Sequence, residues 1–69
     1  MKESQHVELL RDVDVARITG MSVSSVRRWR IMNIGPKFLK LGASVRYKLA
    51  DLSLWLESRP TGGGDGVGV

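Results

Sequence analysis

The chain has 69 residues, a net charge of +4 and no cysteine. A chain this short forms one small domain, which buries only about 60% of the surface that its unfolded form exposes. Disulfides are excluded, and because the single histidine, His6, lies in a polar stretch, we expect no structural metal and no cofactor. The apolar runs are far shorter than the roughly 20 residues that span a bilayer, and the N-terminus lacks the apolar region of a signal peptide. We therefore predict a soluble protein of the cytoplasm.

The positive charge is concentrated in the middle of the chain. Residues 23–48 contain seven Lys or Arg and no Asp or Glu, whereas residues 1–22 sum to −1 and residues 49–69 sum to −2. Because a solvated surface normally mixes charges of both signs, this segregation favours a surface that binds a polyanion over one that only keeps the protein soluble.

The first predicted helix covers residues 11–20. Asp12 and Asp14 lie near its start, where negative charge suits the helix dipole, and Gly20 can adopt the left-handed conformation that ends a helix. Four residues with suitable spacing are expected to form its inner face. They are Val15, Ala16, Ile18 and Thr19.

A second helix is predicted to begin after Ser22, which is a good N-cap, and to continue to about Met32, with Gly35 and Pro36 ending it. Only a tight turn separates it from Gly20. The two helices must therefore cross at a large angle, as in a helix-turn-helix.

A β-hairpin is predicted over residues 37–48, with its turn at Gly42, Ala43 and Ser44. The apolar residues of the hairpin are expected to face inward and the basic residues outward. The inward set is Phe38, Leu41, Val45 and Tyr47, and the outward set is Lys37, Lys40, Arg46 and Lys48.

A third helix is predicted over residues 50–59, with Asp51 in its first turn and one apolar stripe formed by Leu52, Trp55 and Leu56. The glycine-rich stretch after Pro60 has no apolar period and is expected to be disordered. We thus expect a mainly α domain with a small hairpin over residues 9–58, a flexible tail over 1–8 and a disordered tail over 59–69.

The second helix has two unlike faces. At 100° per residue, Val26 and Trp29 share the core face, whereas Ser24, Arg27 and Arg28 lie on the opposite face and Arg30 falls on a flank. No carboxylate lies nearby in sequence to neutralise these arginines. Arginine in the major groove can bind guanine O6 and N7 with two donors, so this face is expected to read DNA. The alternative is that the arginines only bind phosphate.

Three segments, LLRDVDVARITGMSVSSVRRW, GPKFLKLGASVRY and ADLSLWL, resemble the winged helix-turn-helix of phage excisionases, which is related to the DNA-binding half of mercury-resistance-type (MerR) regulators. The resemblance spans residues 9–58. It departs at Arg11, where the family usually has a capping Thr, so that Asp12 is expected to cap the first helix or the helix to start less firmly. Val23 and Ala43 replace frequent basic residues of the recognition helix and the wing tip. The residues that carry the resemblance are Leu9, Leu10, Val15, Ala16, Gly20, Ser22, Val26, Arg28, Trp29, Lys40, Leu41, Gly42, Arg46, Tyr47, Asp51, Leu52, Trp55 and Leu56.

The resemblance implies a DNA-binding protein that is not an enzyme. As an excisionase, it would bind tandem direct repeats of double-stranded DNA near an attachment site, head-to-tail with other copies of itself, bend the DNA and direct an integrase toward prophage excision. The hairpin would be a wing on the next backbone segment or minor groove. The expected DNA-binding residues are Ser22, Ser24, Ser25, Arg27, Arg28, Arg30, Lys37, Lys40, Ser44, Arg46 and Lys48.

Two other functions fit the same residues. A small phage or prophage transcriptional regulator would use the same DNA-binding surface, and a protein-binding module would dock the basic segment on an acidic partner. Enzymatic activity is least compatible with the sequence, because His6 lies in a tail and no general base or metal ligand accompanies Asp12 and Asp14.

Overall fold

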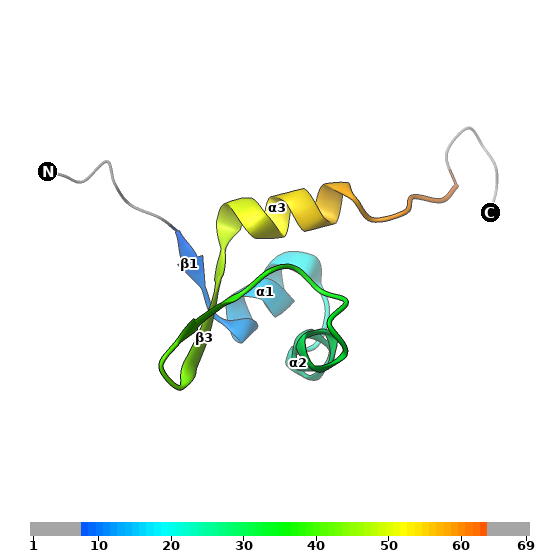
Figure 1. Cartoon of the computed structure of the whole chain (residues 1–69). Coiled ribbons are helices and arrows are strands. Elements are labelled where there is room, and N and C mark those ends of the chain that lie inside the picture. The colour runs from blue at the N-terminus through cyan, green and yellow to red at the C-terminus, as the bar shows by residue number, and fades with distance from the viewer. Residues whose placement is uncertain (1–7, 64–69) are drawn as a thin grey trace, which may run out of the picture.

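The structure, a computed structural model, describes residues 8–63, and the remaining terminal residues, on which most of the two expected tails fall, lie outside this range. It contains three helices and a three-stranded antiparallel sheet with the strand order β1-β3-β2 (Figure 1). This arrangement is compatible with a helix-turn-helix that carries a wing. No helix of residues 8–63 is long and apolar enough to cross a membrane. The elements are β1 (Leu9–Leu10), α1 (Asp12–Thr19), α2 (Val23–Met32), β2 (Leu39–Leu41), β3 (Ser44–Lys48) and α3 (Leu49–Glu57).

Helix α1 begins with a backbone cap made by its third residue. The carboxylate of Asp14 accepts a hydrogen bond from the backbone N–H of Arg11 at 2.9 Å, so the expectation that Asp12 caps this helix is wrong. This backbone hydrogen bond is also the main reason why the pKa of Asp14 is lowered. The helix ends as predicted at Gly20, whose φ of +74° is in the left-handed region.

Helix α2 begins as predicted at Ser22. The Ser22 Oγ accepts a hydrogen bond from the backbone N–H of Ser25 at 3.0 Å. The helix ends at Met32, as predicted, and the residue that ends it is Asn33, which takes the left-handed conformation (φ +57°) at the C-cap before Gly35 and Pro36 are reached. Asparagine adopts this conformation more readily than other residues with a Cβ, which explains the ending.

The β2–β3 hairpin turns through Gly42 and Ala43, as predicted, whereas Ser44, which was also expected in the turn, is the first residue of β3 and pairs with Leu41. Gly42 has a φ of +66° and Ala43 does not have a positive φ, which is the pattern of a two-residue hairpin turn with glycine first. The strand β1 was not expected, since a run of two residues carries no periodic pattern. It pairs with the other edge of β3 and places Leu10 opposite Tyr47.

The register of the sheet corrects the predicted faces of the hairpin. Lys40 pairs with Val45, so these two side chains lie on the same face, whereas Leu41 pairs with Ser44 on the other face. Leu41 is 49% exposed and is not one of the inner residues, contrary to the prediction. Tyr47 is buried and Val45 packs against the core, as expected.

The core lies where α1, α2 and α3 meet β3, and Leu10 from β1 completes it. Trp29, Phe38 and Trp55 are partly buried and pack against it. Two residues predicted to face inward do not, since Ile18 is 43% exposed and Leu56 is 39% exposed. The buried residues of this core are Leu10, Val15, Ala16, Val26, Tyr47 and Leu52.

Candidate nucleic-acid interface

The outer face of α2 presents the residues that the sequence placed there. Ser24, Arg27 and Arg28 are exposed, while Val26 is buried on the opposite side and Trp29 packs against the core. Within residues 8–63, Arg28 makes no ion pair and no side-chain hydrogen bond. Its guanidinium therefore keeps all its donors available to an external acceptor.

The arginines of α2 are not all unpaired, although the sequence suggested that they were. The carboxylate of Asp12, at the start of α1, accepts hydrogen bonds from Arg27 Nε at 3.2 Å and from Arg30 Nη1 at 2.6 Å. A second Arg30 nitrogen, Nη2, lies 3.4 Å from Asp12 Oδ2. Asp12 thus links α1 to two successive turns of α2.

Arg30 serves the fold. Its side chain is only 21% exposed, and its Nη1 also donates a hydrogen bond to the hydroxyl of buried Tyr47 at 2.8 Å. Its guanidinium lies 5.8 Å from the ring centroid of Phe38. These contacts with Asp12, Tyr47 and Phe38 hold Arg30 inside the protein, so it is the weakest of the predicted DNA contacts.

The ionisation of this cluster follows from its contacts. Partial burial alone would raise the pKa of Asp12, but the hydrogen bonds from Arg30 and Arg27 outweigh it and hold that pKa below its usual value. The hydrogen bond to Asp12 is the main reason why the pKa of Arg30 is raised. The cluster is therefore fully charged at neutral pH.

Two of the three serines at the start of α2 already form side-chain hydrogen bonds within the protein. Ser22 caps the helix, and its Oγ also donates a hydrogen bond to Ser25 Oγ at 3.0 Å. Ser24 has no hydrogen-bond partner among residues 8–63, so its hydroxyl is the most available of the three. Ser22 and Ser25 remain predicted contacts, with hydroxyls that already have a protein partner.

The basic residues of the hairpin are spread over both its faces. Lys40 is exposed on the Val45 face, while Arg46 lies on the opposite face, half-buried, with its Nη1 donating to the carbonyl of Val45 at 2.7 Å. Ser44 is exposed at the start of β3, and Lys48 is exposed where β3 meets α3.

An open hollow of about 480 Å³ brings the start of α2 together with the hairpin. Arg27 and Arg30 from α2 and Arg46 from the hairpin line it, so the fold brings three of the predicted DNA contacts to one place. Asp12, Val45 and the turn residue Ala43 also line it. A phosphate or a base edge approaching α2 beside the hairpin would enter at this hollow.

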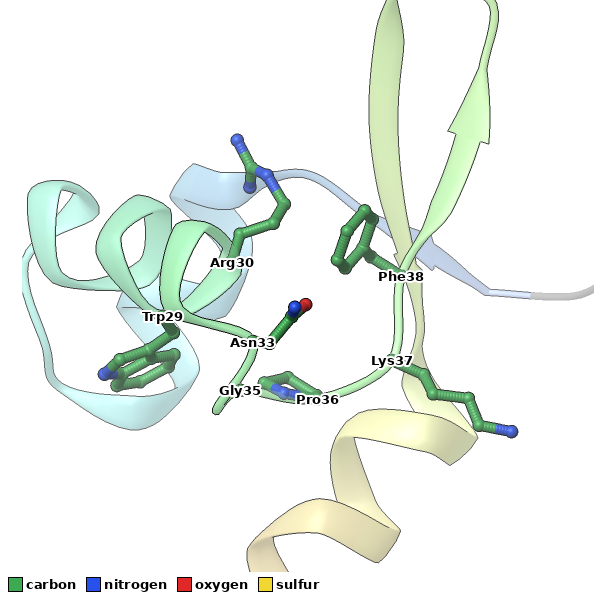
Figure 2. A pocket seen from close by; sticks show the side chains of 7 residues that line it. All are labelled: Trp29, Arg30, Asn33, Gly35, Pro36, Lys37 and Phe38. Atoms are coloured by element: carbon green, nitrogen blue, oxygen red, sulfur yellow. The ribbon is translucent and has the colours of Figure 1, made fainter.

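A second hollow, of about 290 Å³, lies at the other end of α2 (Figure 2). Figure 2 shows the side chains of Asn33 and Phe38 directed into it, whereas the side chain of Lys37 points away. Lys37 is exposed and lines this hollow together with Arg30, whereas Arg27 and Arg46 line the first one. The fold therefore separates Lys37 from the surface formed by Arg27 and Arg46.

Two charged residues of the first hollow were not among the predicted site residues. Arg11 lines it directly, and Asp12 holds the arginines that face it. From the sequence, Asp12 was interpreted as a dipole or capping residue of the first helix, because its partners lie 15 and 18 residues away. The acid-free composition of residues 23–48 was the one available signal, since an arginine held inside the fold, like Arg30, requires an acid from another segment.

No protein-family model matches the chain, and no curated protein matches it in sequence.

Proposed function

We propose that the protein is a sequence-specific double-stranded DNA-binding protein with a winged helix-turn-helix fold. The supporting observation is that Arg27, on the exposed face of α2, and the hairpin residue Arg46 line one open hollow. Arg28 is exposed on the same face of α2. In this proposal α2 enters the major groove, and the β2–β3 hairpin projecting from the helices (Figure 1) is the wing that contacts the adjoining backbone.

A salt titration tests DNA binding. Six predicted cations stay accessible when Arg30 is set aside, and if about four of them reach phosphate, binding should weaken roughly a hundredfold between 50 and 200 mM salt. The measurement is the affinity for a 30-base-pair duplex by fluorescence anisotropy. An affinity that does not change with salt, or that is absent at 50 mM, would reject the proposal.

We further propose that the protein acts as an excisionase. One short recognition helix and one wing contact few base pairs, so specificity would come from several copies bound head-to-tail on tandem direct repeats. Contacts of this kind do not close into a ring, and they would extend along the DNA and curve it. The resemblance of residues 9–58 to excisionases supports this role.

Sedimentation and an excision assay test this role. We expect a monomer in free solution, cooperative binding to repeated sites, and integrase-catalysed excision that requires the protein. A stable dimer at micromolar concentration would exclude the head-to-tail arrangement. Full recombination without the protein would exclude the excisionase role, and control of transcription from a single operator would indicate a regulator instead.

A further inference from the structure

We infer that Asp12 is a positioning residue that orients Arg27 for a two-donor contact with DNA. The inference rests on the proposed DNA-binding function and deepens it. Asp12 belongs to α1 and lies outside α2, and its role follows from the way its two oxygens are used: Oδ1 accepts from Arg30, and Oδ2 accepts from both Arg27 and Arg30.

The two arginines are held in different ways. Arg30 has two nitrogens within hydrogen-bond distance of Asp12, and one of them also binds the hydroxyl of Tyr47. Arg27 is held by Nε alone, at 3.2 Å from Asp12 Oδ2, and its side chain is 63% exposed. Asp12 therefore fixes Arg30 completely and Arg27 only at one edge.

The single hydrogen bond to Asp12 leaves the two terminal nitrogens of Arg27 available to an external acceptor. A guanidinium has five N–H donors, and Nε carries one of them. Within residues 8–63 Arg27 makes no other hydrogen bond, so the four donors on its two terminal nitrogens are available. Because the guanidinium is planar and rigid, holding Nε restricts the directions in which these donors point. The side chain then needs less ordering when DNA arrives.

The position of Arg27 suits an acceptor pair. It lines the open hollow between α2 and the hairpin together with Arg46, where DNA would approach. Two parallel N–H donors match either the O6 and N7 edge of guanine or two oxygens of one phosphate. The tether would therefore favour an arginine at this position over a lysine, which has charge but no Nε.

The Asp12 carboxylate is itself held in place by its surroundings. The Asp12 side chain is only 17% exposed, and the bonds from Arg30 hold it from the other side. Arg30 is in turn fixed by buried Tyr47. The chain of contacts from Tyr47 through Arg30 and Asp12 to Arg27 thus transmits the rigidity of the core to the DNA-facing surface.

A double-mutant cycle tests the inference. The probes are a 20-base-pair duplex enriched from a random library by the wild-type protein and a scrambled duplex of the same composition. We expect Asp12→Asn to weaken binding of the enriched duplex by about fivefold to tenfold, and to cause no further loss when Arg27→Ala is already present. The matched control is Asp14→Asn, which also removes one negative charge from the first turn of α1 but contacts Arg11 and Arg17 instead.

The two duplexes distinguish the two acceptors. Loss confined to the enriched duplex would assign Arg27 to a base edge, and equal loss on both would assign it to a phosphate. The same loss in the Arg27→Ala background would overturn the inference, as would tighter binding of both duplexes by Asp12→Asn, because Asp12 would then only oppose the charge of DNA.

Two further measurements distinguish loss of the Asp12–Arg27 contact from loss of folding and from failure of the proposed DNA binding. Arg27→Lys leaves Asp12 and Arg30 paired and should reproduce the loss seen with Asp12→Asn, whereas wild-type affinity in this variant would overturn the inference. In the free protein, the Arg27 Nε–H resonance should be protected from exchange, and this protection should be lost in Asp12→Asn. A wild-type protein that binds neither duplex would reject the proposed function, and an unprotected Nε–H would reject the tether itself.

Discussion

The indole rings of Trp29 and Trp55 lie 4.9 Å apart between centroids and are tilted by 45°, which joins α2 directly to α3. Trp55 strengthens this junction, since its Nε1 donates a hydrogen bond to the carbonyl of Ile34 at 3.1 Å. The guanidinium of Arg59 also lies over the ring of Trp55, 4.7 Å from its centroid. The orientation of α2, and hence of its arginines, depends on this aromatic contact.

Replacing Trp29 with Ala should therefore destabilise the domain by about 3 kcal/mol, because the change removes a large packed side chain and its aromatic partner contact. In a domain of this size such a loss approaches the whole free energy of unfolding. Urea denaturation followed by the fluorescence of Trp55 measures it. Ile31→Ala is the control on the same helix, since Ile31 is 82% exposed and its removal should change stability by less than about 0.5 kcal/mol. Equal stability of the two variants would contradict the prediction.

Gly35 is required for the approach of the chain to Trp29. A Cβ at position 35 would lie 2.8 Å from the Cβ of Trp29, an atom fixed to the backbone of α2. We expect Gly35→Ala to destabilise the domain by about 1–3 kcal/mol through this overlap. Gly62→Ala is the control, because a Cβ there meets nothing within 4 Å. Thermal denaturation followed by circular dichroism compares the two, and a Tm for Gly35→Ala that equals the wild type would show that α2 can move aside.

The charged cluster of Asp12 makes stability depend on pH in the acid range. The folded-state pKa of Asp12 is lowered below its value in the unfolded chain. The contribution of this carboxylate to the free energy of unfolding is therefore fully present above about pH 4 and is lost as the pH falls through the folded-state pKa. We expect Asp12→Asn to be less stable than the wild type at pH 7 and the difference to shrink at pH 3. Urea midpoints at the two pH values measure it. A difference of the same size at both would mean that the Asp12 carboxylate does not stabilise the fold through its charge.

Arg28 offers the simplest test of the proposed DNA-binding surface, because it makes no ion pair or side-chain hydrogen bond within residues 8–63. We expect Arg28→Ala to weaken an enriched duplex by about 1–3 kcal/mol more than a scrambled one, with unchanged stability. Lys40→Ala should weaken both duplexes alike. Arg17→Ala, which removes the same charge from a side chain paired with Asp14 on α1, should alter neither by much. Equal loss on both duplexes for Arg28→Ala would make it a phosphate contact.

The elements that were predicted correctly are those with local signals. Ser22 and Gly20 mark helix ends through side-chain capping and backbone conformation, and both act within a few residues. The turn at Gly42 likewise depends on a single positive φ. Local chemistry of this kind is visible in one stretch of sequence.

The errors concern contacts between distant segments. The face to which Leu41 points is set by the register against β3, and β1 exists only because Leu10 finds Tyr47 across the sheet. In the candidate site, the different roles of Arg30 and Arg27 depend on how each of them contacts Asp12, which lies in another helix. The periodicity of α2 placed Arg27 on the outer face and Arg30 on a flank, but it could not show that Asp12 binds both or that Tyr47 holds Arg30.

The pairing of β1 with β3 has a consequence for the order in which the chain folds. Leu9 lies opposite Lys48, and the backbone N–H of Leu49 donates to the carbonyl of Glu8 at 3.1 Å, so this pairing closes a loop of nearly the whole domain. The packing of α1 on α2 and the pairing of β2 with β3 each join segments that are close in the sequence. Their loop-closure entropy is therefore smaller than that of the β1–β3 pairing. We therefore expect β1 to dock last during folding and to separate first during native-state opening. The amide of Leu49 should then exchange its hydrogen with solvent faster than the amide of Val26 in the buried part of α2, and the reverse order would contradict this sequence of events.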